Sequence, residues 1–308
     1  MTERCASVAR DHGESPRGSA SRARRWLLVE QPGPWGRDAI LDSNLPDEVG
    51  DHLTRLSREL PARVLLLRRT GGTGTPGTER AVMAGVSLPQ GGGWLERFWL
   101  DDVRQLIDLD LSGVSEGRSV GGEPVIEPTY LVCTNGKHDA CCATYGLPVA
   151  QRLTELRAPQ TWECSHVGGD RFAANVVCLP DGILYGHLAP EEVGELVAAH
   201  EQRRMVLARC RGRSALAFPA QAAELLVRER LGLDGLDELR FDGMRRQDTG
   251  FRVRFRGPGG GPIDALVHRR EHPEVRVMTC GTDPAAPPVH ELTDLDLGPG
   301  ALVAGSAP

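Results

Sequence analysis

The chain has 308 residues, of which 40% are hydrophobic and 25% charged, which suffices for one large or two medium-sized globular domains. Its formal net charge of −6 argues against a nucleic-acid partner, because phosphate recognition needs a basic surface. The apolar runs are too short to cross a membrane, and residues 1–20 lack the apolar segment of a signal peptide. We therefore expect a cytoplasmic protein whose eight cysteines are reduced thiols or metal ligands rather than disulfides.

The N-terminal third is predicted to contain a short tail and then a β-α-β-β-β-α unit. Residues 1–22 are rich in Arg, Ser and Gly, and we expect them to form a disordered tail. Continuous apolar runs predict buried strands, whereas apolar residues at helical spacing predict amphipathic helices. The predicted elements are a strand at 26–31, a helix at 45–60, strands at 63–69, 81–88 and 94–100, and a helix at 101–111. They form a first unit, residues 23–120, which contains no cysteine.

The same order of elements recurs about a hundred residues later. It comprises a strand at 130–133, a helix at 142–157, strands at 161–167, 172–179 and 183–188, and a helix at 190–204. We predict an α/β protein with two tandem thioredoxin-like units, the second spanning residues 121–210; one continuous mixed sheet is the alternative. Since the first unit lacks cysteine, we interpret it as a scaffold or docking half.

Residues 211–308 are predicted to form a smaller, β-rich α+β region. A helix at 218–232 precedes strand-like segments at 238–246, 250–257, 263–270 and 274–282. In the segment 250–257, apolar side chains alternate with arginines, which we interpret as one buried and one solvated face of an antiparallel sheet rather than a docking patch for an acidic partner. Residues 297–308 are expected to fray.

Cysteine and histidine concentrate between Tyr130 and His187, which hold five of the eight cysteines and three of the nine histidines. One group pairs Cys133 with Cys141 or Cys142 across a polar loop, and a second runs from Cys164 to Asp170 one helix and one strand later. Thiolate and imidazole are the ligands that soft and borderline metals prefer. The crowding indicates a metal or redox site, whereas Cys178, in the run VVCL, is interpreted as a core residue.

These motifs resemble a known family. The segments CTNGKHDACC and SHVGGDRFAANVV, the element P-x-G-x-x-Y-G and the earlier WLLVEQPGPWG are similar to the sucrase/ferredoxin-like family of thioredoxin-like [2Fe–2S] proteins, over roughly residues 24 to 200. The family holds its cluster through C-x8-C and H-x3-H, which implies Cys133, Cys142 and His166 as ligands here. The fourth position falls on Asp170 where the family has histidine. The fourth ligand is therefore Asp170, Cys164 or Cys141.

Helical spacing also separates the two neighbouring cysteines of the predicted helix 142–157. Cys142 shares a face with Val149 and Leu153 and should point inward, whereas Cys141 should face water. The helix N-terminus would favour a thiolate at Cys142. Two further cysteines, Cys210 and Cys280, stand alone in the sequence, and we interpret both as non-ligands.

The sequence thus predicts an electron-transfer or redox protein with a [2Fe–2S] cluster on Cys133, Cys142, His166 and Asp170, and with unknown donor and acceptor proteins as partners. The alternative is a structural or protein-interaction zinc module using Cys133, Cys142, Cys164 and His166. The protein is expected to be an electron carrier rather than a catalyst, because no motif of a hydrolase, metalloprotease or phosphate-binding loop occurs.

Overall fold

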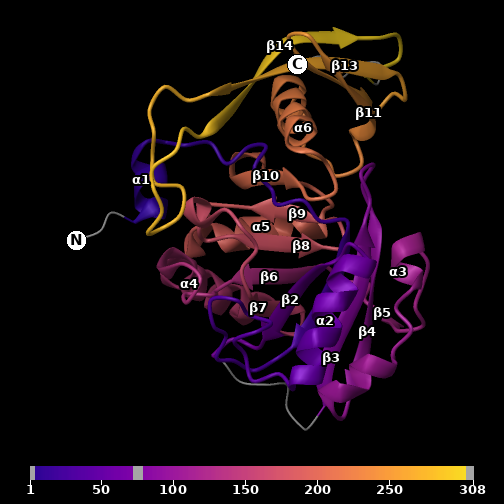
Figure 1. Cartoon of the computed structure of the whole chain (residues 1–308). Coiled ribbons are helices and arrows are strands. Elements are labelled where there is room, and N and C mark those ends of the chain that lie inside the picture. The colour runs from indigo at the N-terminus through magenta and orange to yellow at the C-terminus, as the bar shows by residue number, and fades with distance from the viewer. Residues whose placement is uncertain (1–3, 72–78, 303–308) are drawn as a thin grey trace.

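A computed structural model describes residues 4–71 and 79–302, and shows a mixed α/β protein with one large and one small β-sheet (Figure 1). The large sheet has ten strands in the order β10-β9-β8-β6-β7-β2-β1-β3-β4-β5. Its strands are β1 (Arg25–Glu30), β2 (Arg63–Arg68), β3 (Arg80–Ser87), β4 (Gly93–Leu100), β5 (Glu123–Pro124), β6 (Thr129–Cys133), β7 (Thr161–Cys164), β8 (Val176–Leu179), β9 (Ile183–Tyr185) and β10 (Cys210–Arg213).

The two halves of this sheet pair their strands in the same way. Strand β1 is parallel to β2 and antiparallel to β3, which is antiparallel to β4. In the second half, β6 is parallel to β7 and antiparallel to β8, which is antiparallel to β9. The halves join where β2 and β7 run antiparallel, with Leu67 opposite Cys164. The ten strands therefore form one continuous mixed sheet built from two halves with the same pairing.

The sheet curls, so that strands from both halves share one apolar interior. Ser87 Oγ at the end of β3 donates to the carbonyl of Pro180 in the β8–β9 turn at 2.6 Å, which brings distant parts of the sheet together. The shared core contains Trp26, Leu65, Leu67, Met83, Leu131, Cys133, Trp162, Cys164 and Val177. Because each half contributes to this core, neither half buries its apolar surface alone.

Helices cover the other face of each half. Helix α2 (Asp47–Glu59) packs on the first half through Val49 and Leu53. Helices α4 (Ala140–Arg157) and α5 (Val193–Glu201) cover the second half. The predicted helix at 101–111 is instead a 3-10 helix, η1 (Val103–Asp108), followed by the one-turn helix α3 (Gly113–Glu116). The Asp102 carboxylate caps η1 by accepting from the backbone N–H of Arg104.

The expectation of a disordered tail is wrong for the described residues 4–22. Helix α1 (Cys5–Asp11) buries Cys5, Ala6 and Ala9, and Arg10 donates to the carbonyl of Ala173 at 2.6 Å. The composition of this segment predicts disorder, because Arg, Ser and Gly outnumber the few small apolar residues that lie at helical spacing and form the buried face. The N-terminal helix is therefore packed against the start of α4 and the segment around Ala173, at one side of the second half (Figure 1).

The C-terminal region is a four-stranded antiparallel sheet with helix α6 (Phe218–Leu231) packed on it. Its strands are β11 (Arg240–Gln247), β12 (Gly250–Arg256), β13 (Pro262–Glu271) and β14 (Pro288–Leu297). The strand predicted at 274–282 is wrong: this segment is an irregular connection between β13 and β14. The Thr279 hydroxyl donates to the Asp170 carboxylate and the backbone N–H of Cys280 donates to the Asp139 carboxylate, so neither group pairs with a neighbouring strand. Of the end predicted to fray, Ala301 is buried, and residues 303–308 lie outside the described part.

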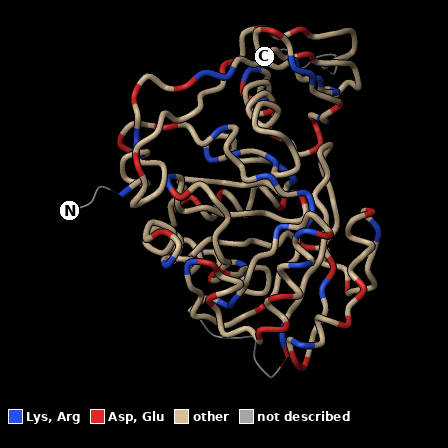
Figure 2. The backbone as a smooth tube through the Cα atoms, viewed as in Figure 1, with Lys and Arg blue, Asp and Glu red and all other residues tan. Residues whose placement is uncertain are grey.

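The described chain shows no concentrated field of one charge. Figure 2 shows Lys and Arg interspersed with Asp and Glu along the backbone. No helix in the described ranges is long and apolar enough to span a bilayer.

Candidate metal centre

The first thiol of the candidate site lies at the C-terminal end of β6. Cys133 is the last residue of this strand, and its backbone N–H donates to the carbonyl of Asn175 at 3.0 Å. The apolar sequence YLVC forms a central strand because both of its faces are covered. The Cys133 side chain is 1% exposed and points into the shared core. The strand thus fixes one buried sulfur at its C-terminal end, in the middle of the sheet.

The second thiol comes from the first turn of α4. Asp139 caps this helix, and its Oδ1 accepts from the backbone N–H of Cys141 at 2.8 Å. Gly146 lets α4 approach β6 closely, because a Cβ at this position would lie 2.2 Å from the Cys133 carbonyl oxygen. Cys142 is buried, as the helical spacing predicts, and its sulfur lies within 4.8 Å of the Cys133 sulfur.

The remaining two predicted residues lie on the loop after β7. His166 and Asp170 flank Gly168 and Gly169, which have φ of +85° and +79° and so need glycine. The Arg63 guanidinium donates to the His166 carbonyl at 2.7 Å. This hydrogen bond restrains the backbone of the loop next to the His166 side chain. The Asp170 side chain is restrained separately, because the Thr279 hydroxyl of the β13–β14 connection donates to Asp170 Oδ2 at 3.0 Å.

The structure places the four predicted residues near one another, but only Cys133, Cys142 and His166 have potential ligand atoms that all lie within 4.8 Å of one another. The His166 Nδ1 atom lies 4.0 Å from Cys133 Sγ and 3.9 Å from Cys142 Sγ. Asp170 Oδ1 lies 3.5 Å from Cys142 Sγ and 3.2 Å from His166 Nδ1. Potential ligand atoms from β6, from α4 and from the β7 loop thus converge within one small volume.

The two thiols are electrostatically unequal. A hydrogen bond from Cys142 lowers the pKa of Cys133, with burial opposing and His166 assisting. The same hydrogen bond to the Cys133 sulfur, together with burial, raises the pKa of Cys142. Cys133 is therefore the more acidic of the two thiols, and Cys142 is the one that holds its proton more tightly. A metal ion would displace that proton, since thiolate is the ligating form.

A buried arginine lies behind the ligand loop. Arg211 of β10 donates to the carbonyl of Gly168 at 2.8 Å and to Asn175 Oδ1 at 2.7 Å. Burial, with Arg171 adding repulsion, lowers the pKa of Arg211 to about 9, while Asp170 and the two site cysteines favour its charge. In the sequence Arg211 is one of several arginines in a basic stretch, so its contact with the ligand loop was not predicted.

His138 is a further candidate ligand. Its ring stacks on that of His166, with centroids 3.6 Å apart and planes at 15°. His138, His166 and Asp170 have potential ligand atoms that all lie within 4.8 Å of one another. The sequence motif places His138 in the same polar loop as Cys133, but the spacing gave no reason to prefer it to a solvated residue.

The alternative fourth ligands lie elsewhere. Cys164 is buried in the shared core and joins no group of potential metal ligands in the described residues. Cys141 is also buried, so the prediction that it faces water is wrong: α1 and the segment around Cys280 cover it. Cys178 is a core residue as expected, and Cys210 lies in the same cluster.

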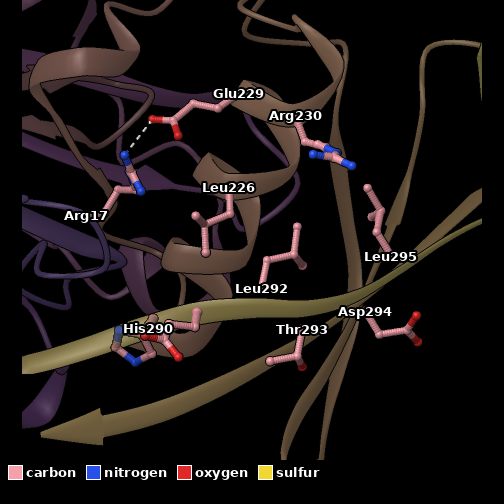
Figure 3. Close-up of a pocket in the computed structure, with 10 residues that line it drawn as sticks. Arg17, Leu226, Glu229, Arg230, His290, Leu292, Thr293, Asp294 and Leu295 are labelled. Carbon is pink, nitrogen blue, oxygen red and sulfur yellow. Dashed lines mark ion pairs between the residues drawn. The ribbon is translucent and has the colours of Figure 1, made fainter.

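A groove between α6 and β14 lies apart from the cysteines (Figure 3). An ion pair between Arg17 and Glu229 at 3.0 Å crosses one side of it. No thiol lines this groove in the described chain, and it forms no part of the candidate metal centre.

The fold and this site define a mixed α/β protein with a buried thiol–imidazole–carboxylate group able to bind a metal. Comparison with known families matches the one described as Sucrase/ferredoxin-like over residues 16–212, more than half of the chain. The chain belongs to this family. Comparisons with curated proteins and with solved structures gave no match.

Proposed function

We propose that the protein is an electron-transfer or redox protein whose [2Fe–2S] cluster is held by Cys133, Cys142, His166 and Asp170. The observation that carries the proposal is the grouping of two buried thiols and an imidazole, Cys133, Cys142 and His166, with the Asp170 carboxylate 3.2 Å from the imidazole. The family's ferredoxin-like character supports the same conclusion.

The donor set fits such a cluster. Thiolates and imidazole are established ligands of [2Fe–2S] centres, and the cluster supplies one-electron redox chemistry. A histidine ligand raises the reduction potential, because it opposes reduction with less negative charge than a thiolate does. Arg211 adds a positive charge behind the loop and should raise the potential further.

The strand pairing supports tandem thioredoxin-like units. In each half, the first strand lies between the second and the third, and the fourth pairs with the third. The first half has no cysteine between Cys5 and Cys133, so it serves as a scaffold that completes the shared core.

Two residues compete for the fourth position. Asp170 lies 3.2 Å from His166 Nδ1, and its other oxygen accepts from Thr279, which restrains its orientation. His138 offers a softer nitrogen donor from the stacked ring. We assign Asp170, because it also approaches Cys142 Sγ directly.

Visible absorption of purified variants tests this assignment. Asp170→Ala should bleach the protein, while His138→Ala should keep its colour. Cys164→Ser is the matched control, because Cys164 lies on the strand leading into the same loop, outside the ligand group. If His138→Ala loses its colour while Asp170→Ala keeps it, the fourth ligand is His138 rather than Asp170.

A mononuclear zinc site is the second candidate. Cys133, Cys142 and His166, whose potential ligand atoms all lie within 4.8 Å of one another, could instead hold one zinc ion. With Cys164 outside the group, this site would use Asp170 or His138 in its place. Zinc is colourless, so the absorption spectrum separates the two candidates.

The partners would be protein electron donors and acceptors, and the protein would be a carrier rather than an enzyme with its own substrate. The thiols must stay reduced to bind metal, which is why we expect a cytoplasmic location.

A further inference from the structure

A second group of sulfurs lies beside the first and is built from parts of the chain far apart in sequence. Cys5 comes from α1, Cys141 from the first turn of α4, and Cys280 from the connection between β13 and β14. Their Sγ atoms form a nearly equilateral triangle, with separations of 3.7 Å for Cys5–Cys141, 3.5 Å for Cys5–Cys280 and 3.6 Å for Cys141–Cys280.

A carboxylate completes the group. Asp139 Oδ2 lies 3.6 Å from Cys5 Sγ and accepts from the backbone N–H of Cys280 at 2.8 Å. The backbone N–H of Cys5 in turn points at Cys280 Sγ, 3.4 Å away. Backbone N–H groups directed at ligand atoms are the usual surroundings of a metal–thiolate site.

We infer that Cys5, Cys141, Cys280 and Asp139 form a second metal site, which binds a single zinc ion. Sulfurs about 2.3 Å from a tetrahedral zinc ion lie about 3.8 Å apart, and an oxygen at about 2.0 Å lies about 3.5 Å from each sulfur. The observed separations of 3.5 to 3.7 Å match this geometry. Three thiolates with one carboxylate is a donor set that zinc accepts.

A disulfide explains the group less well. The three sulfurs are equally spaced, so no pair is set apart for bonding, and a disulfide would leave the third thiol beside a buried carboxylate. Cys280 is the only one of the three that is partly exposed, and it gives an ion a path to the site.

The zinc site would be structural. It would fasten α1 and the β13–β14 connection to the start of α4, one residue before Cys142. The same connection carries Thr279, which holds Asp170. Zinc at this site would therefore keep the N- and C-terminal segments over the first metal centre. This inference is independent of the proposed function, because it involves different ligands and a different ion.

Zinc analysis of the full-length protein, purified from zinc-supplemented cells and challenged with a chelator, tests the inference. Wild-type protein and the Cys133→Ser/Cys142→Ser double variant, which lacks the first centre, should each retain about one zinc per chain. Adding Cys280→Ser to the double variant should lower the retained zinc roughly tenfold or more. Cys178→Ala, at a buried core cysteine, is the matched control and should leave it unchanged.

Two further measurements keep the test decisive if Cys280→Ser folds poorly. Cys280→His restores a zinc ligand and should recover zinc retention. X-ray absorption at the zinc edge should find three sulfur neighbours at about 2.3 Å in the double variant. Three results would overturn the inference. They are a double variant that retains no zinc, equal zinc content in the Cys280→Ser and Cys178→Ala variants, and an intact mass that shows a disulfide. Iron and sulfide content reports on the first centre separately.

Discussion

A buried ion-pair network should make Glu224 one of the most sensitive positions in the C-terminal region. Its carboxylate accepts from Arg213 Nε at 2.9 Å and from Arg228 Nε at 3.0 Å, and all three side chains are at most 2% exposed. Burial alone would raise the pKa of Glu224, but the two guanidiniums outweigh it and lower that pKa. The carboxylate therefore stays charged and joins α6 to β10.

Glu224→Gln should leave two buried guanidiniums without a counter-charge. Removing one partner of a buried ion pair costs about 3 to 5 kcal/mol of unfolding free energy. The matched control is Glu229→Gln on the same helix, whose partly exposed pair with Arg17 is drawn in Figure 3. Such a pair contributes at most about 1 kcal/mol.

Thermal unfolding followed by circular dichroism distinguishes the two variants. Glu224→Gln should lower Tm by about 10 °C, and Glu229→Gln by no more than about 3 °C. Because β10 also carries Arg211, the visible absorbance of Glu224→Gln should be lost at a correspondingly lower temperature. Equal Tm values for the two variants would refute the reasoning.

Three other predictions concern the centre and its surroundings. His166→Cys should keep the protein coloured but lower its reduction potential, as measured by voltammetry, because a thiolate adds negative charge; an unchanged potential would argue against histidine ligation. Arg211→Gln should also lower the potential, and no shift would show that its charge is not felt at the centre. Burial lowers the pKa of His200 to about 4, and its neutral ring is hydrogen-bonded to the Tyr185 hydroxyl at 2.9 Å. The folded state therefore favours neutral His200, and the unfolding free energy should fall by up to about 3 kcal/mol as the pH drops from 6.5 to 4. Acid titrations of unfolding should be flatter in His200→Asn, and an equally steep profile would contradict this.

Local patterns predicted most of the secondary structure, and the resemblance to the family pointed to the residues that meet at the first candidate site. The spacing of apolar residues in α4 places Cys142 inward, and the loop after β7 lies next to it because β6 and β7 are parallel neighbours. The ends of adjacent parallel strands lie side by side, which brings Cys133 of β6 near His166 of the loop after β7.

The sequence could not show contacts between distant segments. Cys141 has a polar helical face by spacing, yet α1 and the β13–β14 connection bury it. Cys5 and Cys280 are isolated in sequence, 275 residues apart, and only the tertiary fold brings their sulfurs to 3.5 Å. The sequence left open whether the two halves form separate units or one continuous mixed sheet, because the pairing of β2 with β7 has no local signature.

The central claim is tested most directly by iron and acid-labile sulfide analysis of anaerobically purified wild-type protein, with its visible spectrum recorded on the same sample. The account predicts a red-brown protein with about two iron and two sulfide per chain, which bleaches on reduction. A colourless protein that binds only zinc at Cys133 and Cys142, even after reconstitution with iron and sulfide, would contradict it.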